Sequence, residues 1–119
     1  MTQYKPLRFI QGQHFETLVP GLLRRVTYNN AEAIRINTAD DDFLELDWYD
    51  AKDSRKLVIL SHGLEGNSRR RYMKGMAKYM HSNGYNVLAW NYRSCGTRIN
   101  QQLRFYHSGD TEDLDTIVR

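Results

Sequence analysis

The sequence lacks the long apolar runs that a membrane span or a secretory leader requires. No stretch of the 119 residues approaches the roughly 20 consecutive apolar residues of a transmembrane helix. The opening residues, MTQYKPLRFIQGQHF, also lack the uninterrupted apolar core of a signal peptide. We therefore expect no transmembrane segment and a cytoplasmic location.

Cysteine is nearly absent as well. Cys95 is the only cysteine in the sequence, so no internal disulfide can form, which fits a reducing compartment. The four histidines, at positions 14, 62, 81 and 107, have no cysteine or acidic companions at zinc-ligand spacing. We expect no metal site and no cofactor.

The composition that remains is typical of a globular domain. Hydrophobic residues make up 40% and charged residues 26%, which argues against disorder, and the length suits one small domain. The net charge of +3 is mild, and the basic residues are scattered apart from Arg69, Arg70 and Arg71. The charge pattern therefore gives no reason to expect a nucleic-acid partner.

Residues 1–30 are interpreted as an N-terminal arm, and residues 31–119 as part of an α/β domain. In the arm, apolar residues within 14–26 have near-helical spacing that Pro20 and Gly21 interrupt. This pattern predicts two short helical turns that lie on the main body.

Two alternating segments follow the arm and predict an antiparallel hairpin at a sheet edge. They are residues 31–37 (AEAIRIN) and residues 43–49 (FLELDWY), joined by a turn at 39–42. In the second segment, Leu44, Leu46 and Trp48 share one face, and Glu45 and Asp47 share the other. We expect the polar face to be exposed to water.

The pattern then changes to a strand, a helix and a second strand. Residues 57–60 (LVIL) are apolar without alternation, as in a strand buried on both faces, and residues 86–90 (NVLAW) predict a second buried strand. A helix is predicted from about Ser68 to about Ser82, capped by Asn67 or Ser68 and ended by Asn83-Gly84. Its expected apolar stripe consists of Met73, Met76, Ala77 and Met80. This arrangement predicts a right-handed crossover between parallel strands.

The last ten residues, DTEDLDTIVR, predict the beginning of another helix. Asp110 and Thr111 suit its N-cap, and Leu114, Ile117 and Val118 begin an apolar stripe. An α/β sheet rarely ends on a helix that has no strand to return to. We therefore expect the chain to be the N-terminal half of a larger fold.

Four segments in order carry a family resemblance: HFETLVPGLLRR, DDDFLELDW, LSHGLEGNS and FYHSGDTEDL. Together they resemble the YheT-like branch of the α/β-hydrolase superfamily, over nearly the whole chain but only the front of that fold. The resemblance implies the strand order first, second, fourth, third. It also implies a serine hydrolase that acts on carboxylic esters, short-chain or acyl-lipid, through a Ser-His-Asp triad and an oxyanion hole.

The nucleophile of such an enzyme is missing from this sequence. In relatives a G-x-S-x-G elbow follows the next strand, and no serine here lies in that frame. We therefore assign no catalytic residue and expect the chain to be cut before the elbow. The 119 residues alone are expected to be inactive.

The resemblance assigns the oxyanion hole to His62, Gly63 and Leu64. The Leu64 backbone N–H would face the developing oxyanion, and Gly63 would allow close approach of the backbone. The alternative is a plain turn between strand and helix, with His62 as a packed, hydrogen-bonded residue. The ordered segments favour the oxyanion interpretation.

Relatives tend to have Arg-Gly-Cys-Ser-Gly where this chain has Arg93-Ser94-Cys95-Gly96-Thr97. Ser94 thus replaces a glycine that permits a left-handed turn, while Asn100 keeps its register. We interpret Cys95 as a small residue packed under a loop rather than as a reactive thiol beside Arg93.

Two further groups have a functional and a structural interpretation. The basic run at 69–71 would attract anionic substrates or lipid headgroups at the mouth of the site, but a solvated helix face is favoured. His107 and Asp110 resemble a catalytic pair, but we interpret Ser108 and Asp110 as helix-capping groups.

Other function classes stay open or are weak. The chain could be a non-catalytic remnant or interaction module, and residues 57–62, which lack proline and inward charge, would then self-associate as a sheet edge. A nucleotide-binding domain is disfavoured, because no glycine-rich phosphate loop follows either apolar strand.

Overall fold

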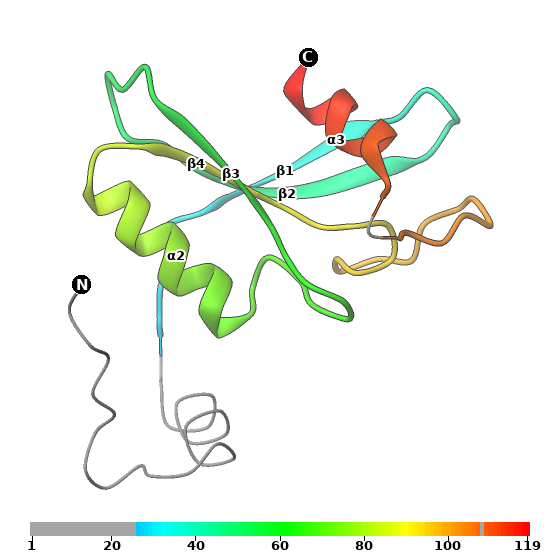
Figure 1. Ribbon diagram of the computed structural model, residues 1–119, viewed down its shortest axis with the longest axis horizontal. Coiled ribbons are helices and arrows are strands. Elements are labelled where there is room, and N and C mark those ends of the chain that lie inside the picture. Colours follow the sequence, from blue (N-terminus) through cyan, green and yellow to red (C-terminus); the bar gives the residue numbers. More distant parts are fainter. Residues whose placement is uncertain (1–25, 108) are drawn as a thin grey trace, which may run out of the picture.

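The computed structural model describes residues 26–107 and 109–119. The helical turns predicted within 14–26 are therefore almost entirely outside the described residues, and so is Ser108. The described chain forms a four-stranded sheet with α2 and α3 on opposite sides (Figure 1). The elements are β1 (Glu32–Asn37), β2 (Phe43–Tyr49), β3 (Leu57–Ser61), α2 (Arg71–Ser82), β4 (Asn86–Trp90) and α3 (Thr111–Val118). None of the described helices has the length and apolarity needed to cross a bilayer.

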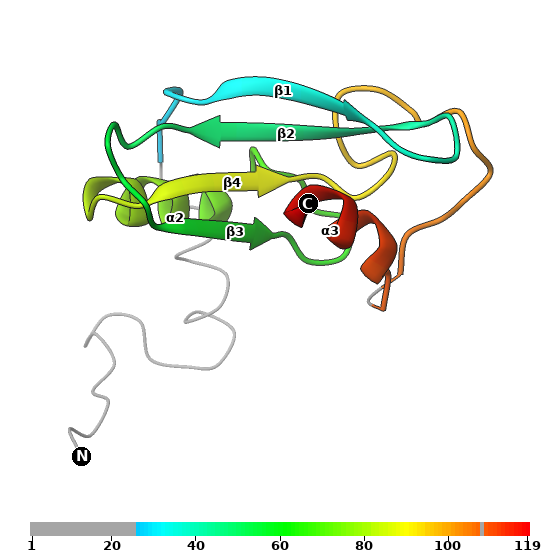
Figure 2. The same cartoon turned by 90° about the horizontal axis from the view of Figure 1, so that it is seen from above.

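The strand order is β1-β2-β4-β3, which confirms the expected order (Figure 2). β2 pairs antiparallel with both β1 and β4, whereas β3 and β4 are parallel and are linked through α2. The predicted hairpin and parallel unit are therefore both present. β1 and β3 form the two edges of the sheet, and both β3 and β4 end near the loop that leads to α3 (Figure 2).

The main core lies between α2 and the sheet. Tyr49, Val87 and Ala89 on the strands pack with Met73 and Ala77 on the helix, and all five are buried. The predicted helical stripe is thus confirmed at its centre. Its flank is different: the side chain of Met76 is 46% exposed, because it faces the unpaired edge of β3.

The expectation that one face of β2 would be exposed to water is wrong. The alternation is present, but Asp47 on the polar face is only 7% exposed. Its carboxylate accepts a hydrogen bond from the Ser68 hydroxyl, with 2.5 Å between the oxygens. β2 lies between β1 and β4, and the segment that leads into α2 covers its polar face.

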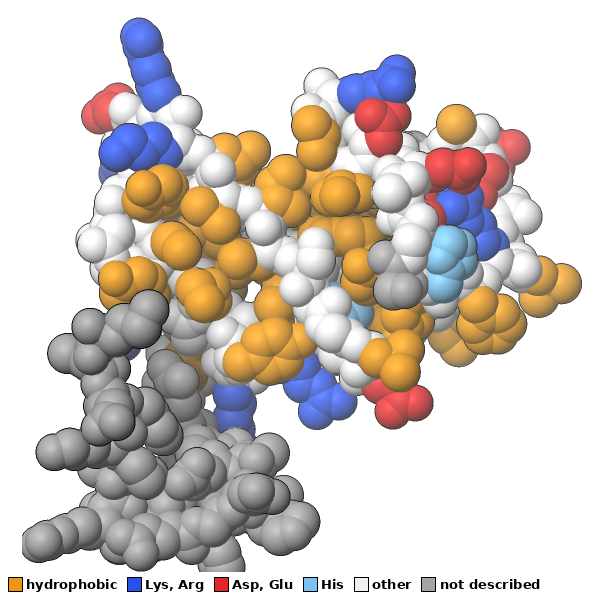
Figure 3. Space-filling view, viewed as in Figure 1, with side chains coloured by type: hydrophobic (Ala, Val, Ile, Leu, Met, Phe, Trp, Pro, Cys, Tyr) orange, Lys and Arg blue, Asp and Glu red, His pale blue; other side chains and the backbone are white. Residues whose placement is uncertain are grey.

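The expectation that residues 57–60 would be buried on both faces is also wrong in the described chain. β3 has a neighbour only in β4, so Val58, Ile59 and Leu60 are half-buried and Leu57 is 53% exposed. Figure 3 shows hydrophobic side chains gathered at the surface between α2 and α3, where β3 runs.

The helix α2 begins later than the sequence predicts. Its N-cap is Arg70, with no side-chain capping bond, rather than Asn67 or Ser68. The Ser68 hydroxyl is occupied by Asp47, and the Asn67 side chain accepts the Arg69 N–H within a preceding turn. The end is as predicted, with Asn83 as C-cap followed by Gly84 in the left-handed region, at φ 78°.

The helix α3 begins where the sequence predicts, directly after Asp110. The Asp110 side chain does not cap it, however, because the carboxylate instead pairs with Arg104, with 2.6 Å between nitrogen and oxygen. Asp113 is the buried residue of α3, whereas Leu114 and Ile117 are only half-buried. The helix is thus attached through charge rather than through its apolar stripe.

Candidate functional site

The turn after β3 contains the three residues predicted for the oxyanion hole. His62 is 4% exposed, and its Nε2 accepts the backbone N–H of Tyr92 at 3.2 Å. An accepting Nε2 places the proton of a neutral ring on Nδ1, which donates to the Gly63 carbonyl at 2.8 Å. The side chain of His62 is therefore a packed, hydrogen-bonded support of the turn.

The backbone N–H groups of the turn are not equivalent. The N–H of Gly63 donates to the Tyr72 hydroxyl and that of Glu65 donates to the Tyr106 hydroxyl, both at 2.9 Å between nitrogen and oxygen. The N–H of Gly66 donates to the Gly63 carbonyl, also at 2.9 Å. Within residues 26–107 and 109–119, the N–H of Leu64 has no hydrogen-bond partner. The turn therefore presents one unpaired donor.

The turn needs unusual backbone geometry at two positions. Glu65 lies in the left-handed region at φ 53°, which costs free energy for a residue with a side chain. A Cβ atom at Gly66 would lie 2.8 Å from the Gly63 carbonyl oxygen and 3.0 Å from His62 Nδ1. Glycine at position 66 therefore lets the turn close on itself.

Aromatic rings lie under the turn. The Tyr92 ring meets His62 edge to face at a centroid distance of 5.0 Å, and it stacks on Tyr106 at 5.0 Å. The ring of Trp90, at the end of β4, has its centroid 4.3 Å from that of Tyr92. Its indole N–H donates to the Ser61 hydroxyl. The cluster connects the end of β4 and the following loop to the end of β3.

A buried ion network holds the base of that loop. The Arg93 side chain is 2% exposed and binds Asp113 through Nε and one terminal nitrogen, at 2.8 and 2.7 Å. The same guanidinium reaches Asp40 at 2.6 and 3.1 Å and Asp42 at 3.3 Å. One cation therefore joins the β1–β2 turn, the end of β4 and α3.

The fully buried Asp42 also organises the loop after β4. Its carboxylate accepts the Asn100 side-chain amide at 2.9 Å and the backbone N–H groups of Gln101 and Gln102 at 3.1 and 3.2 Å. Burial alone would raise the pKa of Asp42, but these donors favour the anion more strongly and hold the pKa below its ordinary value.

Hydrogen bonds with Arg93 also favour the charged form of the groups that they join. The hydrogen bonds from this guanidinium hold the pKa of Asp40 well below its usual range. The hydrogen bonds to Asp113 and then to Asp40 in turn raise the pKa of Arg93. Asp40, Asp42 and Arg93 are therefore charged at neutral pH.

Ser94 lies in the left-handed region, which glycine adopts more readily than serine, with φ at 61°. Its N–H donates to the Asn100 side-chain oxygen at 2.6 Å, and its hydroxyl accepts the Asn100 N–H at 3.1 Å. This reciprocal pair stabilises a conformation that serine otherwise disfavours. Asn100 thus holds the Ser94 end of the loop in place.

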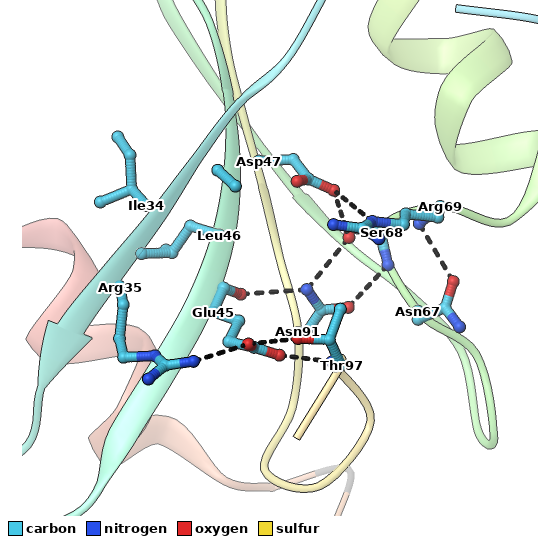
Figure 4. Close-up of a pocket in the computed structure, with 12 residues that line it drawn as sticks. Ile34, Arg35, Glu45, Leu46, Asp47, Asn67, Ser68, Arg69, Asn91 and Thr97 are labelled. Carbon is cyan, nitrogen blue, oxygen red and sulfur yellow. Dashed lines mark hydrogen bonds and ion pairs between the residues drawn. The ribbon is translucent and has the colours of Figure 1, made fainter. Parts of the chain in front are cut away.

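A polar cavity of about 410 Å³ lies beside the turn but does not include it (Figure 4). Asn91 lies at its centre. The Asn91 side-chain oxygen accepts the Ser68 backbone N–H at 2.8 Å, and its amide nitrogen donates to the Ser68 hydroxyl at 3.0 Å. Its amide also donates to the Glu45 carbonyl at 3.0 Å. His62, Gly63 and Leu64 do not line this cavity. Its polar groups satisfy one another and hold β2, β4 and the start of α2 together.

Comparison with known proteins identifies the fold and its relatives. YheT of Escherichia coli (strain K12), provisionally named an esterase, is 31% identical over 121 residues, covering 98% of this chain and 35% of that protein. Phospholipase ABHD3 of Bos taurus is 32% identical over 91 residues, or 70% of this chain and 22% of that protein. The Pyrococcus furiosus esterase Pf2001 superposes with a TM-score of 0.60 and 28% identity, covering 79% of this chain and 39% of that structure.

The chain belongs to the α/β-hydrolase superfamily. The YheT-like resemblance and the α/β-hydrolase fold class are thereby confirmed. No protein-family model matches the sequence. The chain spans about a third or less of the length of YheT and ABHD3.

The remaining candidates of this α/β-hydrolase chain have structural partners. Arg69 lies 3.9 Å from the Asp47 carboxylate, and Arg70 donates to the Glu65 carbonyl at 3.2 Å. His107 is exposed, and its ring accepts the Gly109 N–H at 3.2 Å rather than contacting Asp110. Arg69 and Arg70 of the basic run therefore contact the protein itself.

The tyrosines that contact the turn and the partners of Arg93 were not predicted from the sequence. Tyr72, Tyr92 and Tyr106 come from different segments, and a tyrosine has no spacing that predicts a backbone contact. Asp40 and Asp113 lie 53 and 20 residues from Arg93. Acidic residues at the predicted turn 39–42 and in the predicted first turn of the last helix were the only available signal.

The Arg93 network predicts a large effect of removing its cation. We expect Arg93→Met to destabilise the chain by about 3 kcal/mol, because it leaves buried carboxylates without their partner. Arg98→Met, at an exposed position of the same loop, is the control and is expected to change stability by less than about 0.5 kcal/mol. Urea unfolding followed by circular dichroism measures both, and equal midpoints would contradict the assigned role.

The depressed pKa values of Asp40 and Asp42 predict acid sensitivity. As the pH falls below about 4, the unfolded chain takes up protons at these carboxyls before the folded chain does. Their contribution is therefore complete above that pH and is lost as the pH falls toward the folded pKa values. We expect Asp40→Asn to flatten the decline in urea midpoint, and Asp53→Asn, at an exposed turn, to leave it unchanged. Parallel declines in both variants would refute this origin.

Proposed function

We propose that this chain supplies the oxyanion-binding turn of a serine hydrolase that acts on carboxylic esters. The single observation that carries the proposal is the unpaired N–H of Leu64, which lies between two engaged N–H groups at the carboxyl end of β3. A fixed backbone donor in this position suits the negative charge that develops on a carbonyl oxygen. The side chain of His62 would support the turn rather than react.

The reaction would follow the acyl-transfer scheme of such enzymes. A serine oxygen bonds to the ester carbonyl carbon while a histidine takes its proton, and the carbonyl electron pair moves onto the oxygen. The Leu64 N–H and a second donor would stabilise that oxyanion. The intermediate then expels the alcohol, which receives the proton from the histidine, and water releases the acid in a second round. The scheme uses no cofactor.

The names of relatives support the substrate class. YheT is provisionally named an esterase and ABHD3 is named a phospholipase, so short-chain and acyl-lipid esters are both proposed substrates. A cytoplasmic location is also proposed, from the sequence features described above. Fractionation of cells measures it directly.

The proposal is tested by the esterase activity of the full-length protein that contains these residues. We expect it to hydrolyse p-nitrophenyl esters and to be labelled on a serine by a fluorophosphonate. A folded protein that is neither labelled nor active would refute the proposed function.

The 119 residues alone are expected to show no saturable ester hydrolysis. They contain no serine in a G-x-S-x-G frame, and one oxyanion donor cannot replace an attacking serine and its base. A p-nitrophenyl acetate assay with and without a serine-directed phosphonate measures this. Saturable turnover that the phosphonate abolishes would show that the chain contains its own nucleophile.

A second candidate is an interaction module that pairs through the edge of β3. Among the described residues, β3 pairs only with β4, so one side of its backbone is unpaired. Beside it lies an apolar groove of about 600 Å³, lined by Leu60, Tyr72, Met76 and Tyr79 among others. Unpaired strand edges flanked by apolar surface are templates for another strand.

We therefore expect the 119-residue chain to self-associate through residues 57–62. Ile59→Lys places a charge in the middle of this edge and should shift the chain toward monomer. Asn37→Lys adds the same charge on β1 at the opposite edge and is the control. Sedimentation velocity at micromolar concentrations measures association, and circular dichroism confirms that each variant is folded. A monomeric parent chain would rule out this candidate.

A further inference from the structure

Two tyrosine hydroxyls bracket the unpaired N–H of Leu64. Tyr72, in the first turn of α2, accepts the N–H of Gly63, and Tyr106, in the loop before α3, accepts the N–H of Glu65. Both distances are 2.9 Å, although the two tyrosines are 9 and 41 residues from their partners. The N–H groups before and after that of Leu64 are thus hydrogen-bonded to side chains from two separate parts of the chain.

The turn depends on such external contacts. Glu65 is in the left-handed region, which a residue with a side chain adopts only when its surroundings hold it there. The hydrogen bond from its own N–H to Tyr106 is a direct restraint on that conformation. On the other side, Gly66 lacks a Cβ that would come within 3.1 Å of the Tyr72 hydroxyl, so the phenol can approach the backbone.

The carbonyl of the same peptide as the unpaired donor is also hydrogen-bonded. The Gly63 oxygen accepts both His62 Nδ1–H and the Gly66 N–H, at 2.8 and 2.9 Å. The Gly63 carbonyl and the Leu64 N–H belong to one trans peptide and point in opposite directions, so these two bonds fix the orientation of the Leu64 N–H. Among the N–H groups of residues 63–66, that of Leu64 is left without a partner in the described part of the chain.

We propose that Tyr72 and Tyr106 are positioning residues that hold the turn so that Leu64 alone presents its N–H to the substrate oxygen. This inference rests on the proposed oxyanion role of the turn. Each hydroxyl acts through the backbone and contacts no reacting atom. Tyr106 depends in turn on the loop that Arg93 anchors, since it stacks on Tyr92 next to that arginine.

The first test measures the positioning itself in the 119-residue chain. We expect amide hydrogen exchange by NMR to show protected N–H groups at Gly63 and Glu65 and a rapidly exchanging N–H at Leu64. Tyr72→Phe should accelerate exchange at Gly63, and Tyr106→Phe at Glu65, each by roughly tenfold, because one neutral hydrogen bond is lost. Tyr79→Phe, on the same helix with a 64% exposed ring, is the matched control and should change neither.

The second test uses the longest protein that contains these residues. If it hydrolyses esters, Tyr72→Phe and Tyr106→Phe should lower kcat roughly tenfold with KM within about twofold, because the donor is misplaced only for the transition state. Tyr79→Phe should leave both constants unchanged.

The outcomes separate this inference from the proposed function. Exchange rates at Gly63 and Glu65 that do not respond to the two variants would overturn the positioning role, whatever the activity. Responsive exchange with an unchanged kcat would also overturn it, and the hydrolase proposal would stand. Responsive exchange in a protein that hydrolyses no ester would refute the proposed function and leave the two tyrosines with a structural role only.

Discussion

The buried guanidinium of Arg93 is the interaction on which the candidate site depends. A charge this deep is costly unless it is paired and fully hydrogen-bonded, and three carboxylates from the β1–β2 turn and α3 meet that requirement. Each of these segments is irregular or only weakly attached by apolar contacts. The α/β-hydrolase sheet supplies the frame, and this one side chain decides where the surrounding segments lie on it.

The position of the following loop transmits that constraint to the turn after β3. Tyr92 is adjacent to Arg93, and its backbone N–H fixes the tautomer of His62. Asp42 binds the loop further along, through the Asn100 side chain and the backbone N–H groups of Gln101 and Gln102, before the loop reaches Tyr106. A polar network far from the backbone donor thus sets the geometry of the turn through a chain of hydrogen bonds and stacked rings.

Much of the architecture could be predicted from the sequence, because strands and helices leave local periodic patterns. The strand segments and the ends of α2 and β4 follow from alternation, apolar runs and Asn83-Gly84, and the strand order followed from the family resemblance. The start of α2 could not be predicted, because the Ser68 hydroxyl bonds to Asp47, 21 residues away. The tyrosine contacts and the partners of Arg93 were missed for the same reason. Periodicity reports which face a residue occupies, but it does not report which distant side chain shares that face.

The polar interior around Asp47 has a consequence for how the sheet assembles. Asp47 faces the α2 side of β2, where Ser68 binds it and Asn91 binds Ser68 in turn. Sliding β2 by one residue along its neighbours would carry this carboxylate to the opposite face, among Leu88 and Trp90 and away from Ser68. The correct pairing is therefore distinguished from the nearest wrong one by the desolvation of a charge, and not only by the fit of apolar side chains. In a strand with two apolar faces, a shift of one residue would bury no charge, and the register would be less strongly specified.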